Sequence, residues 1–357
     1  MNRLAGRCAG RALLEMPLMA DAAPDLPVTI PPDHPALAYT GFAELRVTPD
    51  AAAWHRTVAD TAPGYTEDAP GGVIRFRTTA AAGEALVEYL PKDDMAGRVH
   101  YHSTGVLLVD GRRAGSFTRP GDAGGVVRIP LPAAGQGAAR TCAVVLPYAD
   151  AVRFRGLCLP AGATLLPLPP EPPKPRYVAY GDSITHGFLA ADAPGGYAWQ
   201  LAEQMHWQLV NLGFGSRAAT PDDGRRVAAL KPDVVTILLG VNDCLGKIPP
   251  ATFAANYQQV LDAIRRERPA IPIVIITPLD VPGKWAGSEP LEQYRQALRD
   301  LARDRHDPQL FVVEGVPLIP PDLTLFQDGL HPNDHGFQIM AAHLAAQLAP
   351  MLKLSTP

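Results

Sequence analysis

The chain has two parts that differ in the periodicity of their apolar residues. From about residue 37 to 165, short runs alternate apolar and polar side chains with a period of two, and clusters containing Gly, Pro and Asp separate them. The runs lie at 41–47, 73–77, 85–89, 126–129 and 151–155. Many short alternating strands with such turn residues between them are typical of a sandwich or jelly roll. We therefore predict an all-β domain over 37–165.

Residues 166–175 contain six prolines and predict a stiff, extended linker. The periodicity of the apolar residues changes after this linker. Beyond it, apolar strands alternate with helices. The strands are expected at 176–180, 208–212, 233–239, 271–277 and 309–313, and the helices at about 195–206, 220–230, 251–268, 288–305 and 334–349. Strands such as 234–239 lack alternation, as expected where helices cover both faces of a parallel sheet. The pattern predicts a three-layer α/β domain over 176–357.

The first 36 residues are rich in Ala and Pro, show little periodicity, and predict a tail or an arm lying on the next domain. Arginines before a short apolar run resemble a signal peptide, but Glu15 and Pro17 interrupt that run. We therefore expect a cytoplasmic location, with secretion as the alternative. No apolar run reaches the roughly 20 residues that a membrane-spanning helix needs.

Composition narrows the possible partners. A length of 357 residues favours two domains, and 47% hydrophobic with 19% charged residues is ordinary for a globular protein. The net charge of −4, without any Lys/Arg block, argues against a nucleic-acid partner. Four scattered cysteines do not make a disulfide framework or a zinc site. Cys142 and Cys158 could pair, but two buried thiols are the better expectation.

Candidate chemistry lies where the predicted strands end. The first strand of the α/β domain runs into Gly181-Asp182-Ser183, and ligands bind at the carboxyl ends of such strands. Ser183 is therefore a candidate nucleophile that needs a base. Asp328 and His331, three apart on a turn before a helix, provide an orienting acid and a base. His331 and His335 could instead bind a metal with Asp328, but no further ligand is evident and we expect no metal.

Acyl transfer also needs donors for the developing oxyanion. Asn242, at the end of the third strand, can offer its side-chain NH2, and the Gly-rich turn at 211–216 can offer backbone N–H groups. Trp285, in the long loop after the fourth strand, is a candidate for the wall of the acyl pocket, as is Phe214 in the turn at 211–216.

Three blocks in order, Gly181-Asp182-Ser183, Gly240-Val241-Asn242-Asp243 and Asp328-Gly329-Leu330-His331, make the domain resemble the SGNH/GDSL hydrolase superfamily. The resemblance implies a flavodoxin-like sheet, with Ser183 as nucleophile, His331 as base and Asp328 as orienting acid. It also implies an oxyanion hole formed by Ser183, Asn242 and a residue of the Gly-rich turn at 211–216.

In the turn at 211–216 the family usually has glycine where this chain has Ser216. The backbone N–H survives the change, but a conformation that favours glycine would be costly for serine. Gly215 is the alternative donor.

The two-domain architecture resembles carbohydrate esterases with an amino-terminal jelly roll, and also acyltransferases that tailor antibiotics. It leaves two enzymatic hypotheses: a serine esterase or deacetylase acting through an acyl-Ser183 intermediate, or an acyltransferase that passes the acyl group to a small-molecule hydroxyl of a natural product or sugar. The expected partner is a small-molecule acyl ester, with a carbohydrate ester and an acyl-CoA donor as the candidates, and no cofactor is needed. A binding protein without catalysis is a third hypothesis, disfavoured by the complete set of Ser183, Asp328 and His331.

Overall fold

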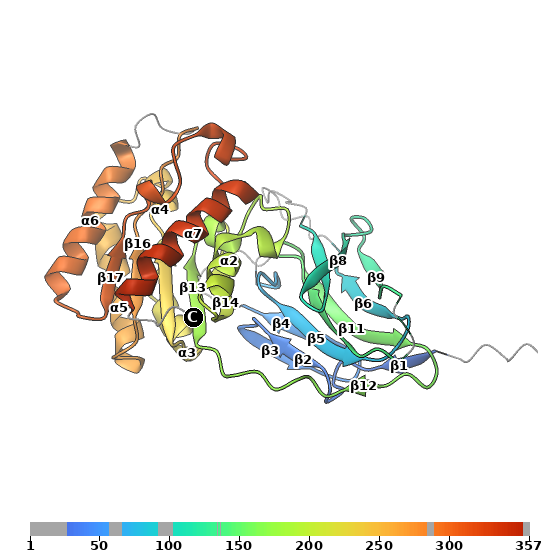
Figure 1. Ribbon diagram of the computed structural model, residues 1–357. Helices are drawn as coiled ribbons and strands as arrows, with labels where there is room; N and C mark the ends of the chain where they lie inside the picture. Colours follow the sequence, from blue (N-terminus) through green and yellow to red (C-terminus); the bar gives the residue numbers. More distant parts are fainter. Residues whose placement is uncertain are drawn as a thin grey trace, which may run out of the picture.

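The computed structural model describes residues 27–56, 66–91, 103–133, 135, 137–283 and 289–352. Two β-sheets built from the first half stand beside an α/β unit built from the second half (Figure 1). None of the helices in these ranges is both long and apolar enough to cross a bilayer.

The first half forms two antiparallel six-stranded sheets, which confirms the predicted β-sandwich. One sheet has the order β3-β4-β11-β6-β9, with β1 paired to β11, and the other has the order β12-β5-β10-β7-β8, with β2 paired to β5. The strands are β1 Val28–Ile30, β2 Ala38–Thr40, β3 Glu44–Val47, β4 Ala52–His55, β5 Val73–Thr78, β6 Glu84–Tyr89, β7 Gly105–Val109, β8 Arg112–Phe117, β9 Gly125–Pro130, β10 Arg140–Val145, β11 Val152–Leu159 and β12 Leu165–Leu166. Inward side chains of both sheets, such as Phe76 and Phe154, share one buried core.

Strand β1 falls within the range 1–36 that we expected to be a tail or an arm lying on the next domain. Val28 pairs with Leu159 and Ile30 with Leu157, so residues 28–30 lie on the sandwich as an added strand. A strand of three residues is too short for a period of two to stand out in the sequence. The strand expected at 41–47 is shorter, because β3 begins at Glu44.

The cysteines in the sandwich are unpaired. Cys142 lies on β10 and Cys158 on β11, in different sheets, and both are free thiols, as is Cys244.

The second half contains a five-stranded parallel sheet of order β14-β13-β15-β16-β17, which confirms the flavodoxin-like α/β prediction. The strands are β13 Arg176–Gly181, β14 Gln208–Gly213, β15 Val234–Leu238, β16 Ile273–Ile276 and β17 Leu310–Val313. The helices are α1 Ser183–His186, α2 Tyr197–Gln204, α3 Asp223–Ala229, α4 Val241–Leu245, α5 Pro250–Glu267, α6 Glu289–Arg305 and α7 Asp334–Met351. Helices α2 and α7 share one core with the sheet, and α3, α5 and α6 share a second (Figure 1).

The sandwich packs directly on the α/β unit. Val106 and Val145 of the sandwich belong to the same buried cluster as Tyr177 and Leu209 of the parallel sheet. Residues 167–175 run between β12 and β13 without forming a strand or helix. The two halves therefore share an apolar seam in addition to their covalent connection.

Candidate active site

Ser183 occupies the first position of a short helix at the end of β13. Asp182 caps this helix, since its carboxylate accepts the Ile184 N–H at 2.9 Å. Ser183 is buried, with only 7% of the residue exposed. The sharp passage from a buried strand into a helix places this side chain at the carboxyl edge of the sheet.

The structure brings Ser183 together with the predicted base His331, which lies 148 residues further along the chain, and with the predicted acid Asp328. Ser183 Oγ lies 2.8 Å from His331 Nε2, and His331 Nδ1 lies 2.8 Å from Asp328 Oδ2. His331 is 7% exposed. Because a carboxylate can only accept, the hydrogen-bond pattern assigns the ring proton to Nδ1. The lone pair of Nε2 then faces the serine hydroxyl.

Asp328 is fixed by its own backbone turn. Its Oδ1 accepts the N–H of His331 at 2.7 Å and that of Leu330 at 3.0 Å. Partial burial raises the pKa of Asp328, but the hydrogen bonds from the His331 backbone and ring outweigh it and hold that pKa below its ordinary value. The carboxylate is therefore ionised at neutral pH.

Asn242 is the second residue of α4, whose N-cap Gly240 follows β15 by two residues. Its Nδ2 donates to the carbonyl oxygen of Arg217 at 3.1 Å. An amide nitrogen carries two protons, so one N–H is held by Arg217 and the other is left for a ligand. The side chain is half-buried, and this single bond fixes which way its amide points.

Ser216 has a φ of 60°, in the left-handed region that favours glycine. The strain expected from a serine at this position is therefore present. Its side chain is exposed and Gly215 is half-buried. Which of the two backbone N–H groups faces an oxyanion stays a prediction.

The two expected pocket residues have different outcomes. Phe214 is fully buried, and the Arg56 guanidinium stacks 4.3 Å from its ring centroid. The pocket assignment for Phe214 is therefore wrong, because this side chain has no exposed surface and belongs to a core cluster of the parallel sheet. Trp285 lies outside the described residues.

Comparison with known proteins agrees with this geometry. Residues 179–339 match the model of the GDSL-like Lipase/Acylhydrolase family. They form a GDSL domain. No curated protein matches the chain in sequence.

Solved structures resemble the whole two-domain arrangement. The salicylyl-acyltransferase SsfX3 from a tetracycline biosynthetic pathway is 21% identical with a TM-score of 0.77, covering 93% of this chain and 99% of its own. Family two carbohydrate esterases from Clostridium thermocellum (17% identity, TM-score 0.67, 89% and 99% covered) and Cellvibrio japonicus (15%, 0.69, 92% and 98%) are also similar. At these identities the likeness shows the shared fold.

Two buried acids of the GDSL domain, whose burial the sequence did not predict, hold the backbone beside the site, and one of them is the capping residue Asp182. Asp243 accepts the Ala219 N–H with both oxygens, at 3.1 and 3.3 Å, and burial raises its pKa to about 6. Burial raises the pKa of Asp182 to about 7, reinforced by the nearby Asp243 and opposed by the Ile184 N–H. Their position beside Ser183 and Asn242 was the available signal, but sequence cannot tell a buried carboxylate from a solvated one.

A second missed cluster supports the turn that carries Ser216. Arg217 Nε donates to Asp223 Oδ2 at 2.7 Å, and the Tyr180 hydroxyl donates to the same oxygen at 2.5 Å. All three side chains are buried. The cluster ties the turn after β14 to β13, the strand that precedes Ser183, and the carbonyl of Arg217 is the one that holds Asn242.

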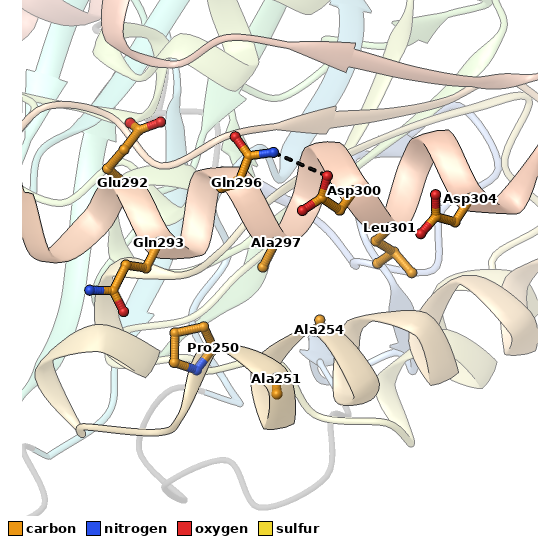
Figure 2. A pocket seen from close by; sticks show the side chains of 10 residues that line it. All are labelled: Pro250, Ala251, Ala254, Glu292, Gln293, Gln296, Ala297, Asp300, Leu301 and Asp304. Atoms are coloured by element: carbon orange, nitrogen blue, oxygen red, sulfur yellow. Dashed lines mark hydrogen bonds between the residues drawn. The ribbon is translucent and has the colours of Figure 1, made fainter.

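A groove elsewhere on the GDSL domain is lined by residues of a different kind. Figure 2 shows the groove between α5 and α6, where Gln296 donates to Asp300 at 3.1 Å. Its lining residues are Pro250, Ala251, Ala254, Glu292, Gln293, Gln296, Ala297, Asp300, Leu301 and Asp304. None of these is a Ser, Cys or His, so the groove offers no nucleophile with a base. Among the described residues, no three His, Cys, Asp or Glu side chains gather as metal ligands would.

Proposed function

We propose that the chain is a serine esterase that cleaves acyl esters of hydroxyl compounds through an acyl-Ser183 intermediate. The observation that carries the proposal is the continuous relay from Ser183 Oγ to His331 Nε2 and from His331 Nδ1 to Asp328, each step 2.8 Å long. A hydroxyl is a poor nucleophile at neutral pH unless a base takes its proton during attack.

In the first step His331 Nε2 takes the Ser183 proton while Oγ attacks the ester carbonyl carbon. The ring then carries a positive charge, which the ionised Asp328 stabilises without taking the proton. As the tetrahedral intermediate collapses, the imidazolium returns that proton to the departing alkoxide. Water, activated by the same ring, next releases the acyl group as a carboxylic acid.

The negative charge that develops on the acyl oxygen needs preorganised donors. The free N–H of the Asn242 amide supplies one, since its other N–H is held by Arg217. The backbone N–H groups of Ser183 and of Ser216 or Gly215 supply the rest. This set lies at the carboxyl edge of the sheet, where β13, β14 and β15 end.

The likeness to a salicylyl-acyltransferase over 93% of this chain favours a second candidate function. An acyltransferase keeps the same acyl-Ser183 intermediate but delivers the acyl group to an alcohol instead of water. The two functions share the relay and differ in whether the second step excludes water and binds an acceptor.

A combined assay tests both. The protein is incubated with p-nitrophenyl acetate and longer acyl esters, with and without sugar or polyphenol acceptors, and the products are identified by mass. A fluorophosphonate probe should label Ser183, and Ser183→Ala should abolish both labelling and turnover. A label on another serine, or turnover retained in Ser183→Ala, contradicts the assignment.

A further inference from the structure

A buried arginine of the sandwich contacts the GDSL domain at the end of β14. Arg56 follows β4, is 3% exposed, and donates through Nη1 to the carbonyl oxygen of Gly213 at 2.7 Å. The same nitrogen lies 3.5 Å from the carbonyl oxygen of Asn211. Its guanidinium also covers the ring of Phe214 at 4.3 Å. Contacts with Asn211, Gly213 and Phe214 therefore fix the segment that leads into Gly215 and Ser216.

The same seam holds the helix that begins with Ser183. His186 Nε2 lies 2.7 Å from the carbonyl oxygen of Tyr148, a residue of the sandwich. His186 Nε2 and Arg56 Nη2 lie 3.5 and 4.0 Å from one carboxylate oxygen of Asp68. His186 and Asp68 are 2% and 1% exposed. The sandwich thus places charged and polar groups against both catalytic segments.

Within the GDSL domain those two segments contact each other directly. Asn211 Nδ2 donates to the carbonyl oxygen of Thr185 at 2.7 Å, and Asn211 Oδ1 accepts the Gly213 N–H at 2.7 Å. A Cβ atom added at Gly213 would lie 2.0 Å from the backbone nitrogen of His186. Because the backbones touch here, a displacement at Gly213 is passed to the helix that presents Ser183.

We propose that Arg56 is a positioning residue for the catalytic site. By donating to the Gly213 carbonyl and covering the Phe214 ring, it holds the turn at 215–216, which offers the backbone N–H for the oxyanion, in its place beside Ser183. This inference rests on the proposed function and extends it. The sandwich is then part of the catalytic apparatus, although it supplies no reacting atom. A misplacement of about 1 Å at such a site can cost about 10²-fold in rate.

Removing the charge tests the proposal against simple loss of packing. Arg56→Met keeps most of the apolar stem but neither donates nor carries charge. Arg140→Met is the matched control, because Arg140 is also buried in the sandwich, at 6% exposed, and donates to the carbonyls of Ala80 and Pro132. Both partners of Arg140 belong to the sandwich, so this variant loses comparable bonds far from the catalytic segments.

We expect kcat for p-nitrophenyl acetate to fall about 10- to 100-fold in Arg56→Met, with KM within about twofold of wild type. Arg140→Met should keep the wild-type kcat even where its melting temperature falls as far. Arg56→Lys, which still reaches the Gly213 carbonyl but cannot reproduce the planar fork, should recover part of kcat. The pH profile should keep its shape, because the relay itself is intact.

Equal kcat values for Arg56→Met, Arg140→Met and wild type would overturn the positioning role. If Arg56→Met does not fold, Arg56→Lys decides, and a wild-type kcat at normal KM in that variant overturns it as well. Failure of the wild-type protein to hydrolyse any ester or to react with the fluorophosphonate overturns the proposed function, and the positioning role with it. The wild-type measurement thus separates the two failures.

Discussion

Asp328→Asn should inactivate the site through the tautomer of His331, for a reason that the turn geometry imposes. In the native turn Oδ1 accepts two backbone N–H groups, from His331 at 2.7 Å and from Leu330 at 3.0 Å. An asparagine must place its carboxamide oxygen there, since an NH2 group would oppose two donors. Its NH2 then takes the place of Oδ2, 2.8 Å from His331 Nδ1.

That amide can only donate to Nδ1, so the ring proton is forced onto Nε2. Nε2 then faces Ser183 Oγ as a donor and can no longer take its proton. The same substitution in a Ser-His-Asp protease lowers kcat by about 10⁴ without moving the triad. At about 1.36 kcal/mol per tenfold change, we expect a loss of roughly 5 kcal/mol of transition-state stabilisation.

Asp328→Ala is the control, because it removes the carboxylate without supplying a donor to the ring. The Asp328 side chain is 42% exposed, so water can satisfy the turn and Nδ1 in that variant. We expect Asp328→Asn to be the slower of the two in kcat for p-nitrophenyl acetate at pH 7.5, with both variants folded by circular dichroism. An Asp328→Asn variant as fast as Asp328→Ala would refute the tautomer argument.

Three further predictions follow from the same site. Asn242→Ala should lower kcat by about 10²–10³ with little change in KM, measured by steady-state kinetics, because its amide acts mainly on charge formed in the transition state. Ser216→Gly should stay active and gain up to about 1 kcal/mol in urea unfolding, since glycine relieves the left-handed φ of 60°. Ser216→Pro should be inactive, because proline deletes the N–H and cannot adopt that φ. Asp182→Asn should unfold at a higher temperature than wild type at pH 8 and at a similar one at pH 4. The pKa of Asp182 is about 7 in the native state and lower in the unfolded state, so the native state binds more protons between pH 4 and pH 8. The stability of the wild type therefore falls as the pH rises through this range. Asparagine still accepts the Ile184 N–H but carries no charge. An equal difference at both pH values would contradict the buried-acid explanation.

The parts of the molecule that sequence predicts well are those set by short-range rules. Parallel strands bring their carboxyl ends to one edge, so the blocks at 181–183 and 240–243, which follow β13 and β15, had to meet if the strand assignment was right. The block at 328–331 lies between β17 and α7, where strand order alone does not place it. The left-handed backbone at Ser216 was also foreseeable, because a glycine is usual there. Phe214 shows the limit of prediction from sequence. The side chain of the residue after a strand can face the solvent or the core, and a turn has no hydrophobic periodicity that indicates which.

The seam between the domains lies beyond that limit for a physical reason. Arg56 bonds to a carbonyl 157 residues away, and His186 to one 38 residues away, so neither partner is visible in a local pattern. Burying such groups costs several kcal/mol unless each finds a partner. An apolar seam alone tolerates sliding, whereas a guanidinium that must meet the Gly213 carbonyl accepts one arrangement. The polar contacts thus fix one relative position of the two domains, which apolar packing alone would not do. The turn at 215–216 needs such a fixed position if its backbone N–H is to face the oxyanion beside Ser183.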